Sequence, residues 1–397
     1  MISVQKAIEL ILDNTHTTNR TQKLPIYYAK NFILAQEIFS DRDYPPFNRA
    51  TMDGYAIRFN DFSIDRQWNV IGEIYAGDNW DYPNLNRELP AIKIMTGAAV
   101  PEDFDVVIKI EDTNRVGNKI HILSEKVKQW MNIAKKGEDT QSGNTIVSQG
   151  TLIDDSILTI AGSMGQLELN VFEPPTVSIF STGNEIVPMG QIPNSNQIRD
   201  SNTILIESMF QNFKSKIKRK VLLPDDLEII KNHLDQSSDS DFCVITGGVS
   251  AGDKDYIPKA LESIGAKEIF HKAMIRPGKP IWFGKKDNTL FFGLPGNPFS
   301  ARVTFKVFIE PALYKFMHLN KPKSIFLPLL SERKKKHGME EYFRARIVNK
   351  ENKSYIKEIS SNGSGDYLNS FGTDGIAIHP ANNMELPQGI NLEFLYW

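Results

Sequence analysis

From Cys243 to Gly265 the chain reads CVITGGVSAGDKDYIPKALESIG. A short apolar run is followed by two glycines, and apolar residues then recur at helical spacing from Ile257, so the stretch predicts a strand, a glycine turn and a helix. Such a turn frees backbone N–H groups at the start of a helix, where they suit an anion. The turn also carries Asp253 and Asp255, which repel an anion. A ligand of this turn must therefore bind both to N–H donors and to carboxylates.

Strands and helices alternate in the same way from Pro174 to about Leu319. The segments TVSIFST, KRKVLL, DFCVIT and NTLFFGLP have the character of strands, and each is followed by a helical pattern. This alternation predicts a doubly wound α/β domain, in which helices cover both faces of a parallel sheet. Ligands of such domains bind beyond the carboxyl ends of the strands. Three turns that contain glycine, STGNE, TGGVSAGD and LPGNP, fall there.

The rest of the chain has a different character. Residues 21–137 and 320–397 contain short apolar runs broken by Pro, Gly, Asp and Asn, which predict β-rich domains. Residues 1–20 and 138–173 are predicted to form a linker and helical domain, in which the second segment packs with the first helix. The predicted fold is multidomain α/β plus β: the α/β domain at 174–319 is flanked by β-rich domains, and the C-terminal one is barrel-like.

Length, net charge and composition limit the kinds of protein that this chain can be. A chain of 397 residues is long enough for about two to four domains. Its net charge of -2 argues against a protein that binds nucleic acid through bulk charge. No apolar run reaches the roughly 18 residues of a membrane span. The N-terminus, MISVQKAIELILDN, lacks the features of a signal peptide, so we expect a cytoplasmic protein.

The chain contains one cysteine, Cys243, within the predicted strand DFCVIT. A disulfide within the chain and a thiolate zinc site are therefore excluded. We expect this cysteine to be a core residue rather than a nucleophile, because the strand would bury it.

Several polar residues follow predicted strands or turns, and each has a structural explanation beside a functional one. Asp53 precedes a glycine, which is typical of a turn. Asp139 favours the start of a helix, and Glu185 follows a strand end where exposed acids are common. Thr96 could bond a ligand or its own turn. Taken one at a time, the local explanations are sufficient for the three acids.

Two cations flank a Pro-Gly bend in AMIRPGKPIWFG. Arg276 and Lys279 are either exposed charges of a hairpin or an oxyanion clamp with many donors. Asn297 or Ser300 could cap the next helix, whose free N–H groups form a second anion site. Donors together with acids fit a phosphorylated ligand carried with Mg²⁺. The glycine turns match neither a Walker A loop nor a Rossmann fingerprint.

Eight motifs occur in one order: MDGYA, IMTGAAVP, GED, STGNE, DSN, TGGVSAGDKDY, PGKP and LPGNPFSA. From about Ser3 to Trp397 the chain thereby resembles the molybdopterin molybdotransferases, the MoeA and gephyrin E-domain family of molybdenum cofactor synthesis. The resemblance implies elongated homodimers of four-domain subunits, in which the α/β domain of one subunit faces the β-rich second domain of the other. It also implies that molybdate is inserted into adenylylated molybdopterin and that the pyrophosphate is cleaved with Mg²⁺, which releases AMP and molybdenum cofactor.

The resemblance implies roles for individual residues. Arg276 stands where many members have lysine, and Asn48 replaces an acid of the commoner motif FDNSAMDGYA. Asp225 or Asp226 matches a further polar residue of the site, and both remain open. The implied catalytic residues are Asp53, Thr96, Asp139, Glu185 and Asp255, of which Glu185 and Asp255 hold the metal. The implied substrate-binding residues are Gly247, Gly248, Ser250, Asp253, Arg276, Lys279, Pro298, Ser300, Arg344 and Ser364.

Three alternatives stay open at this point. The first is adenylylation of molybdopterin, an activity of a smaller relative that resembles the α/β domain alone; the MDGYA and C-terminal regions count against it. The second is a scaffold with an inactive site, and the intact set of acids counts against that. The third is tungstate in place of molybdate, since the two oxyanions are nearly equal in size and charge.

Overall fold

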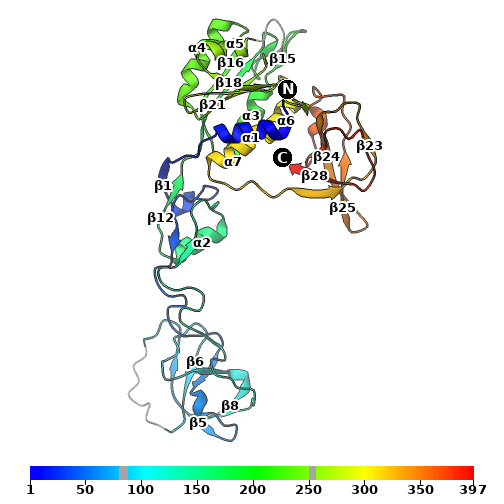
Figure 1. Ribbon diagram of the computed structural model, residues 1–397. Helices are drawn as coiled ribbons and strands as arrows, with labels where there is room; N and C mark the ends of the chain where they lie inside the picture. Colours follow the sequence, from blue (N-terminus) through cyan, green and yellow to red (C-terminus); the bar gives the residue numbers. More distant parts are fainter. Residues whose placement is uncertain (80–87, 250–255) are drawn as a thin grey trace.

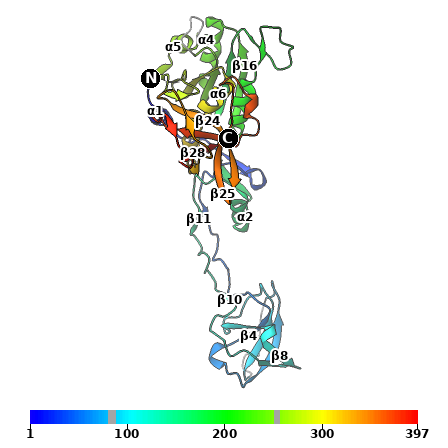
Figure 2. The same cartoon turned by 90° about the vertical axis from the view of Figure 1, so that its right-hand side faces the viewer.

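The structure is a computed structural model of the chain and describes residues 1–79, 88–249 and 256–397. Figures 1 and 2 show an elongated molecule. An α/β body and a C-terminal β-sheet lie side by side at one end, and a separate β-sheet lies at the other. A narrow connecting segment joins the two ends. The multidomain α/β plus β fold class predicted from the sequence is confirmed.

The α/β body is built on a six-stranded sheet with the order β16-β13-β17-β21-β20-β18. The first four strands of this order are parallel, and Cys243 on β17 lies opposite Ser178 on β13 and Phe291 on β21. The strands are β13 (Thr176–Thr182), β16 (Lys216–Leu223), β17 (Phe242–Thr246), β18 (Lys267–His271), β20 (Trp282–Lys286) and β21 (Thr289–Leu294); the pair β14 (Ile186–Val187) and β15 (Ile198–Arg199) lies outside the sheet.

One edge of this sheet departs from the predicted parallel arrangement. β20 pairs antiparallel with β21, and β18 pairs antiparallel with β20. The physical reason is the two-residue turn Asp287–Asn288 between β20 and β21, because so short a connection joins only antiparallel strands. Asp287 adopts the left-handed conformation that such a turn requires (φ 51°).

Helices cover both faces of the sheet. They are α3 (Asn202–Gln211), α4 (Leu227–Gln236), α5 (Ile257–Ser263), α6 (Pro298–Thr304) and α7 (Glu310–Phe316), and the π-helical segment Phe305–Ile309 joins α6 to α7. On β17, Phe242 and Val244 pack with α3 and α7, whereas Cys243 and Ile245 pack with α4 and α5. Burial raises the pKa of the Cys243 thiol to about 12, as expected of a core residue.

The C-terminal sheet has the order β19-β24-β26-β28-β22, and β25 pairs with β24. Its edge strand β19 (Ile275–Arg276) belongs to the loop between β18 and β20, so the α/β body and the C-terminal domain share a sheet. The other strands are β22 (Ile325–Pro328), β24 (Glu340–Lys350), β25 (Lys353–Glu358), β26 (Gly375–His379) and β28 (Asn391–Tyr396), with the separate pair β23 (Arg333–Lys334) and β27 (Glu385–Leu386).

The connecting segment contains paired stretches from two parts of the chain. Its pairs are β1 (Thr21–Pro25) with β12 (Glu168–Phe172), β2 (Ile38–Phe39) with β11 (Thr145–Val147), and β3 (Arg49–Ala50) with β10 (Ile133–Ala134), and α2 (Asp155–Ser163) lies beside them. The first helix, α1 (Val4–Asn14), does not pack there as expected. Its apolar face, Val4, Ala7 and Ile11, lies in the core that contains α7.

The far β-sheet has the order β7-β4-β6-β5-β9-β8. Gly54 begins β4, and a Cβ at this position would lie 1.8 Å from the Ile108 carbonyl oxygen, so only glycine fits this close strand pairing. The strands are β4 (Gly54–Ile57), β5 (Gln67–Ile74), β6 (Pro90–Ile94), β7 (Val106–Lys109), β8 (Thr113–Val116) and β9 (Lys119–Ile122). Short 3₁₀ helices occupy Ile26–Tyr28, Phe59–Asp61, Ile110–Asp112, Ser237–Asp239 and Leu368–Ser370.

No helix in the described ranges has the length and apolar character needed to cross a membrane.

Asp241 joins three segments at the amino-terminal edge of the α/β sheet. Its buried carboxylate accepts two hydrogen bonds from Arg20, at 2.9 and 2.5 Å, and two from Thr176, each at 2.8 Å. Burial alone would raise the pKa of Asp241, but the bonds from Arg20 and Thr176 lower it below its ordinary value. This carboxylate therefore ties the start of β13 and β17 to the segment that leads from α1 into the connecting segment.

We expect Asp241→Asn to lower the free energy of unfolding by about 2 kcal/mol at pH 7, because the carboxylate is buried while Arg20 is half exposed. Since the folded-state pKa is lowered, the contribution is complete above the ordinary aspartate pKa and is lost as the pH falls through the folded-state value. Urea unfolding at pH 7 and in acid measures both effects. Asp239→Asn is the control, because its ion pairs with Lys218 and Arg219 are exposed and worth less than about 1 kcal/mol. Equal losses in the two variants would contradict the assignment.

Candidate functional site

The four parallel strands end at one edge of the sheet, and their loops contact one another there. Beyond β17, the Gly247 N–H donates to the carbonyl of Leu294 at the end of β21 (3.1 Å). Beyond β13 and β16, Asn184 and Asp225 exchange two hydrogen bonds between backbone N–H and side-chain oxygen, each 3.2 Å long. The convergence of glycine turns that the sequence predicts at this edge is therefore present.

Gly247 and Gly248 need glycine for two separate reasons. Both have positive φ, at 90° and 61°. A Cβ on Gly247 would lie 2.5 Å from the Thr182 carbonyl oxygen, and one on Gly248 would lie 3.1 Å from the Thr182 hydroxyl. The backbone of this loop therefore lies against the end of β13. Because the two glycines have no side chains, a ligand can contact the loop backbone directly.

Two buried hydroxyl groups at this edge were not predicted from the sequence. Thr182 and Thr246 end β13 and β17, and neither side-chain oxygen has a hydrogen-bond partner within the described ranges. The same holds for the amide oxygen of Asn202, whose Nδ2 donates to the Gly296 carbonyl (2.7 Å). Unsatisfied buried polar atoms cost free energy, so their grouping at the strand ends favours a ligand site. A threonine immediately before a glycine turn is the signal that could have revealed them.

Ser250, Asp253 and Asp255 lie outside the described residues. The roles predicted for these three residues therefore stay predictions.

The structure distinguishes between the two acids that the sequence left open. Asp226 caps α4, because its carboxylate accepts from the Glu228 and Ile229 N–H groups at 3.0 Å. Asp225 instead faces the turn after β13 through its bonds with Asn184. Glu185, the next residue, is exposed at the same edge. Asp225 and Glu185 thus form the acidic side of the candidate site.

The loop with the Pro-Gly bend packs against α6. A Cβ on Gly278 would lie 2.4 Å from a methyl group of Thr304, so the loop approaches this helix closely. Lys279 is exposed and forms no ion pair within the described part of the chain. Arg276 lies opposite Glu341 in the pairing of β19 with β24. Its charge is therefore partly compensated, and Lys279 is the better candidate for binding an anion.

The C-terminal domain supplies the other side of the site. Asn297, which immediately precedes α6, donates to the Ser364 hydroxyl (2.9 Å). Arg344 on β24 is buried, and its guanidinium carbon lies 3.5 Å from the centroid of the Phe299 ring on α6. The structure thereby brings several predicted residues to the first turn of one helix: Pro298, Ser300, Arg344 and Ser364, with the loop of Lys279 beside them.

Three predicted catalytic residues lie elsewhere. Asp53 precedes β4 and accepts hydrogen bonds of 2.7 Å from both the N–H and the hydroxyl of Thr96, which follows β6. These bonds lower the pKa of the Asp53 carboxyl, the backbone bond having the larger effect. Asp139 lies near the end of the connecting segment, where its N–H donates to the Tyr44 carbonyl (2.9 Å). Figures 1 and 2 show β4 and β6 at the opposite end of the molecule from the α/β body, so one chain does not bring the two groups together.

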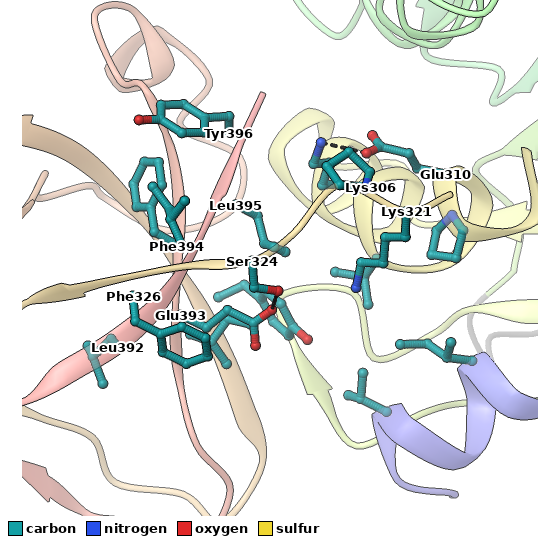
Figure 3. A pocket seen from close by; sticks show the side chains of 18 of the residues that line it. Lys306, Glu310, Lys321, Ser324, Phe326, Leu392, Glu393, Phe394, Leu395 and Tyr396 are labelled. Carbon is teal, nitrogen blue, oxygen red and sulfur yellow. Dashed lines mark hydrogen bonds and ion pairs between the residues drawn. The ribbon is translucent and has the colours of Figure 1, made fainter. Parts of the chain in front are cut away.

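A cavity of about 610 Å³ lies at the joint of α1, the helical segment 306–314 and the C-terminal sheet (Figure 3). Lys306 and Glu310 form an ion pair on its helical side (2.6 Å), and Ser324 donates to Glu393 on its strand side. Its described lining includes none of the predicted site residues. The candidate site is therefore the open edge of the sheet and not this cavity.

Metal binding at the edge would need ligands beyond the described side chains. Within residues 1–79, 88–249 and 256–397, no three His, Cys, Asp or Glu side chains are grouped to hold a metal ion. Mg²⁺ commonly takes one or two carboxylates and completes its shell with water and substrate phosphates. Glu185, an exposed acid after β13, and Asp225, a half-buried acid after β16, suit that mode, because Asp225 is hydrogen-bonded to the residue next to Glu185.

Comparisons with known proteins agree with the resemblance seen in the sequence. Residues 2–165 match the MoeA N-terminal region (domain I and II), and residues 178–315 match a probable molybdopterin binding domain. Molybdopterin molybdenumtransferase of Haemophilus influenzae is 33% identical over 318 residues, which span 79% of this chain and 78% of the relative. The protein of that name from Synechococcus elongatus is 32% identical over 362 residues, 88% of each chain. The crystal structure of a molybdopterin biosynthesis MoeA protein from Pyrococcus horikoshii OT3 has a TM-score of 0.86 at 25% identity and covers 100% of both chains.

Replacing Thr96 by valine removes one of the two hydrogen bonds to Asp53 and keeps the other. We expect the pKa of Asp53 to rise in Thr96→Val but to stay below its ordinary value, because the backbone N–H still donates. Titration of the Asp53 carboxyl by NMR measures this change. Thr96→Ser is the control, since it retains the hydroxyl and should leave the pKa low. An unchanged pKa in Thr96→Val would show that the hydroxyl does not donate to Asp53.

Proposed function

Because the chain belongs to the molybdopterin molybdenumtransferases, a family of transferases of molybdenum cofactor biosynthesis, we propose that it inserts molybdate into adenylylated molybdopterin. The pyrophosphate link is cleaved with Mg²⁺, and AMP and molybdenum cofactor are released. The observation that carries this proposal is the carboxyl edge of the α/β sheet, where acids follow β13 and β16 while a cation and hydroxyls gather at the start of α6, which follows β21. A phosphorylated substrate with a metal and a tetrahedral oxyanion need both kinds of group.

The adenylylated pterin is proposed to lie along the loops after β13 and β17. Gly247 and Gly248 present backbone there, and the unpartnered hydroxyl of Thr182 lies beside them. Ser250 and Asp253, from the same loop, are assigned to this substrate by the family resemblance alone. The position at the end of parallel strands is the usual ligand site of a doubly wound domain.

Molybdate is proposed to bind around the first turn of α6. Lys279 and Arg344 supply positive charge, and the hydroxyls of Ser300 and Ser364 supply donors. Charge-assisted hydrogen bonds of this kind suit a dianion. Pro298 lies on α6, and Arg276 lies in the loop that carries Lys279. The same donors also suit tungstate, which is nearly equal to molybdate in size and charge.

Glu185 and Asp255 are proposed to hold Mg²⁺, and the position of Asp225 beside Glu185 supports an acidic site there. When bound, Mg²⁺ neutralises charge on pyrophosphate oxygens. The chain's own residues hold the substrate in place: the glycine loop receives the nucleotide, and Lys279 and Arg344 hold the oxyanion beside it. Thr96 favours the ionised form of Asp53 and fixes its orientation through two hydrogen bonds, so the carboxylate is placed to orient a water molecule.

A homodimer is proposed because the two groups of candidate residues lie at opposite ends of one subunit. In a twofold dimer, Asp53, Thr96 and Asp139 of one subunit can face the α/β edge of the other. Large apolar side chains exposed on the connecting segment and beside the site support such a contact. They include Tyr27, Tyr28, Leu167 and Ile192, each more than two-thirds exposed.

A turnover assay tests the proposed reaction. Purified protein is incubated with adenylylated molybdopterin, molybdate and Mg²⁺, and AMP release and pterin-bound molybdenum are measured. We expect molybdate-dependent AMP release, at least about tenfold slower in Asp225→Asn. The matched control Asp226→Asn should keep its turnover, because this acid caps α4 and its loss costs at most about 1 kcal/mol of stability. Tight binding of substrate without release would favour a scaffold, and ATP-dependent adenylylation would favour the earlier biosynthetic step.

Mixed dimers test the shared site. We expect Asp53→Asn and Glu185→Gln to be inactive alone, whereas dissociation and reassociation of the mixture should restore about a quarter of wild-type activity, because half of the dimers are mixed and hold one intact site of two. The control mixture of Glu185→Gln with Asp225→Asn should gain no activity above the mean of the two variants, since both residues lie on the same α/β edge and no intact site can form. Equal recovery in both mixtures, or none in either, would refute a site shared between subunits.

A further inference from the structure

Arg302 is a cation without a counter-charge. It lies on α6, two residues after Ser300, and its guanidinium carbon is 3.6 Å from the centroid of the Trp397 ring. Within the described part of the chain it forms no hydrogen bond and no ion pair. Burial and then the charge of Arg344 lower the pKa of Arg302 to about 10. Its surroundings thus disfavour the charge that it carries at neutral pH.

Arg344 acts on Arg302 through its charge, and it also lacks an ion pair with a carboxylate among the residues that the structure describes. Its Nε donates to the Ser370 hydroxyl (3.1 Å) and its Nη2 to the Asp366 carbonyl (2.5 Å), both neutral acceptors. Burial lowers the pKa of Arg344. The Asp366 carboxylate opposes this shift only partly, and it accepts hydrogen bonds from Asn362 and Asn369. The two guanidinium groups therefore interact unfavourably and have little compensating charge within the described residues.

Aromatic rings hold both guanidinium groups in place. Arg344 stacks on Phe299 at 3.5 Å and Arg302 on Trp397 at 3.6 Å, and the two rings meet edge to face with centroids 6.2 Å apart. Phe299 and Arg302 are three residues apart on α6 and so share one face of the helix, which extends to its first turn. That turn contains Ser300 and begins beside Ser364.

Two like charges at close range destabilise the protein unless an anion lies near both. A stacked guanidinium keeps its N–H groups free for an oxyanion, and its position is already set before the ligand arrives. We propose that Arg302 is a further oxyanion-binding residue, and that Arg302 and Arg344 form a guanidinium pair selective for a tetrahedral dianion at the junction of α6 and the C-terminal domain. This rests on the proposed function in taking molybdate as that dianion.

Direct titration of the purified full-length protein with molybdate, by calorimetry, tests the pair. Arg302→Met keeps the stem of the side chain against Trp397 and removes the charge, so molybdate should bind roughly tenfold more weakly. Arg302→Lys should retain most of the affinity. Lys306→Met is the matched control: this cation lies one turn further along the same helical segment but is paired with Glu310 at 2.6 Å, and its loss should not affect molybdate binding.

Perrhenate is a tetrahedral monoanion of similar shape and measures the selectivity. A pair of cations should favour molybdate over perrhenate, and Arg302→Met should reduce that preference. Circular dichroism and thermal unfolding confirm that each variant is folded. Molybdate affinity that is unchanged in Arg302→Met, or altered equally in Arg302→Lys, would assign Arg302 to packing and overturn the proposal, as would a wild-type protein that binds no molybdate.

The molybdate dependence of AMP release separates this inference from the proposed function. If Arg302→Met weakens molybdate binding but the wild-type protein releases no AMP, the guanidinium pair stands and the proposed reaction fails. If the wild-type protein releases AMP and Arg302→Met reaches half-maximal AMP release at the same molybdate concentration as wild type, the reaction stands and the guanidinium pair fails.

Discussion

The parallel pairing of β13, β16, β17 and β21 is the constraint on which the rest of the site depends. Parallel strands end at one edge, so loops that are far apart in sequence must meet there, as the bond from Gly247 to Leu294 shows. Both faces of the sheet are buried by apolar residues that alternate along each strand. Polar chemistry is therefore confined to the loops, and the glycines let these loops approach one another closely.

The joint with the C-terminal domain adds the basic side of the site. β19 pairs with β24, and one apolar core contains residues of both parts, including Phe292 and Ile376. This shared core holds β24 against α6, which places Arg344 over Phe299. A site that spans two packed elements is positioned more accurately than one built from loops alone. The C-terminal domain thus acts through rigid packing as well as through its side chains.

The connecting segment has the opposite effect, because it separates residues that the family resemblance groups together. Two stretches of chain run side by side along it, and Asp53 and Thr96 lie beyond its far end. Both are exposed, so their hydrogen bonds shape a local turn without stabilising a core. Within one subunit these residues therefore lie at the opposite end of the molecule from the α/β edge, which is why the proposed function calls for two subunits.

Much of this could be predicted from the sequence, because periodicity and turn residues are local properties. The alternation of strands and helices, the burial of Cys243 and the convergence of the glycine turns follow from residue order alone. Residue order could not distinguish Asp225 from Asp226, since adjacent acids differ only in the direction in which a turn points them. It could not place α1 against α7, and nothing in it pointed to Arg302. The sequence by itself determined the elements, their order and the family; only the tertiary structure decided which polar groups lack partners and which residues share a surface, because those properties depend on contacts between distant parts of the chain.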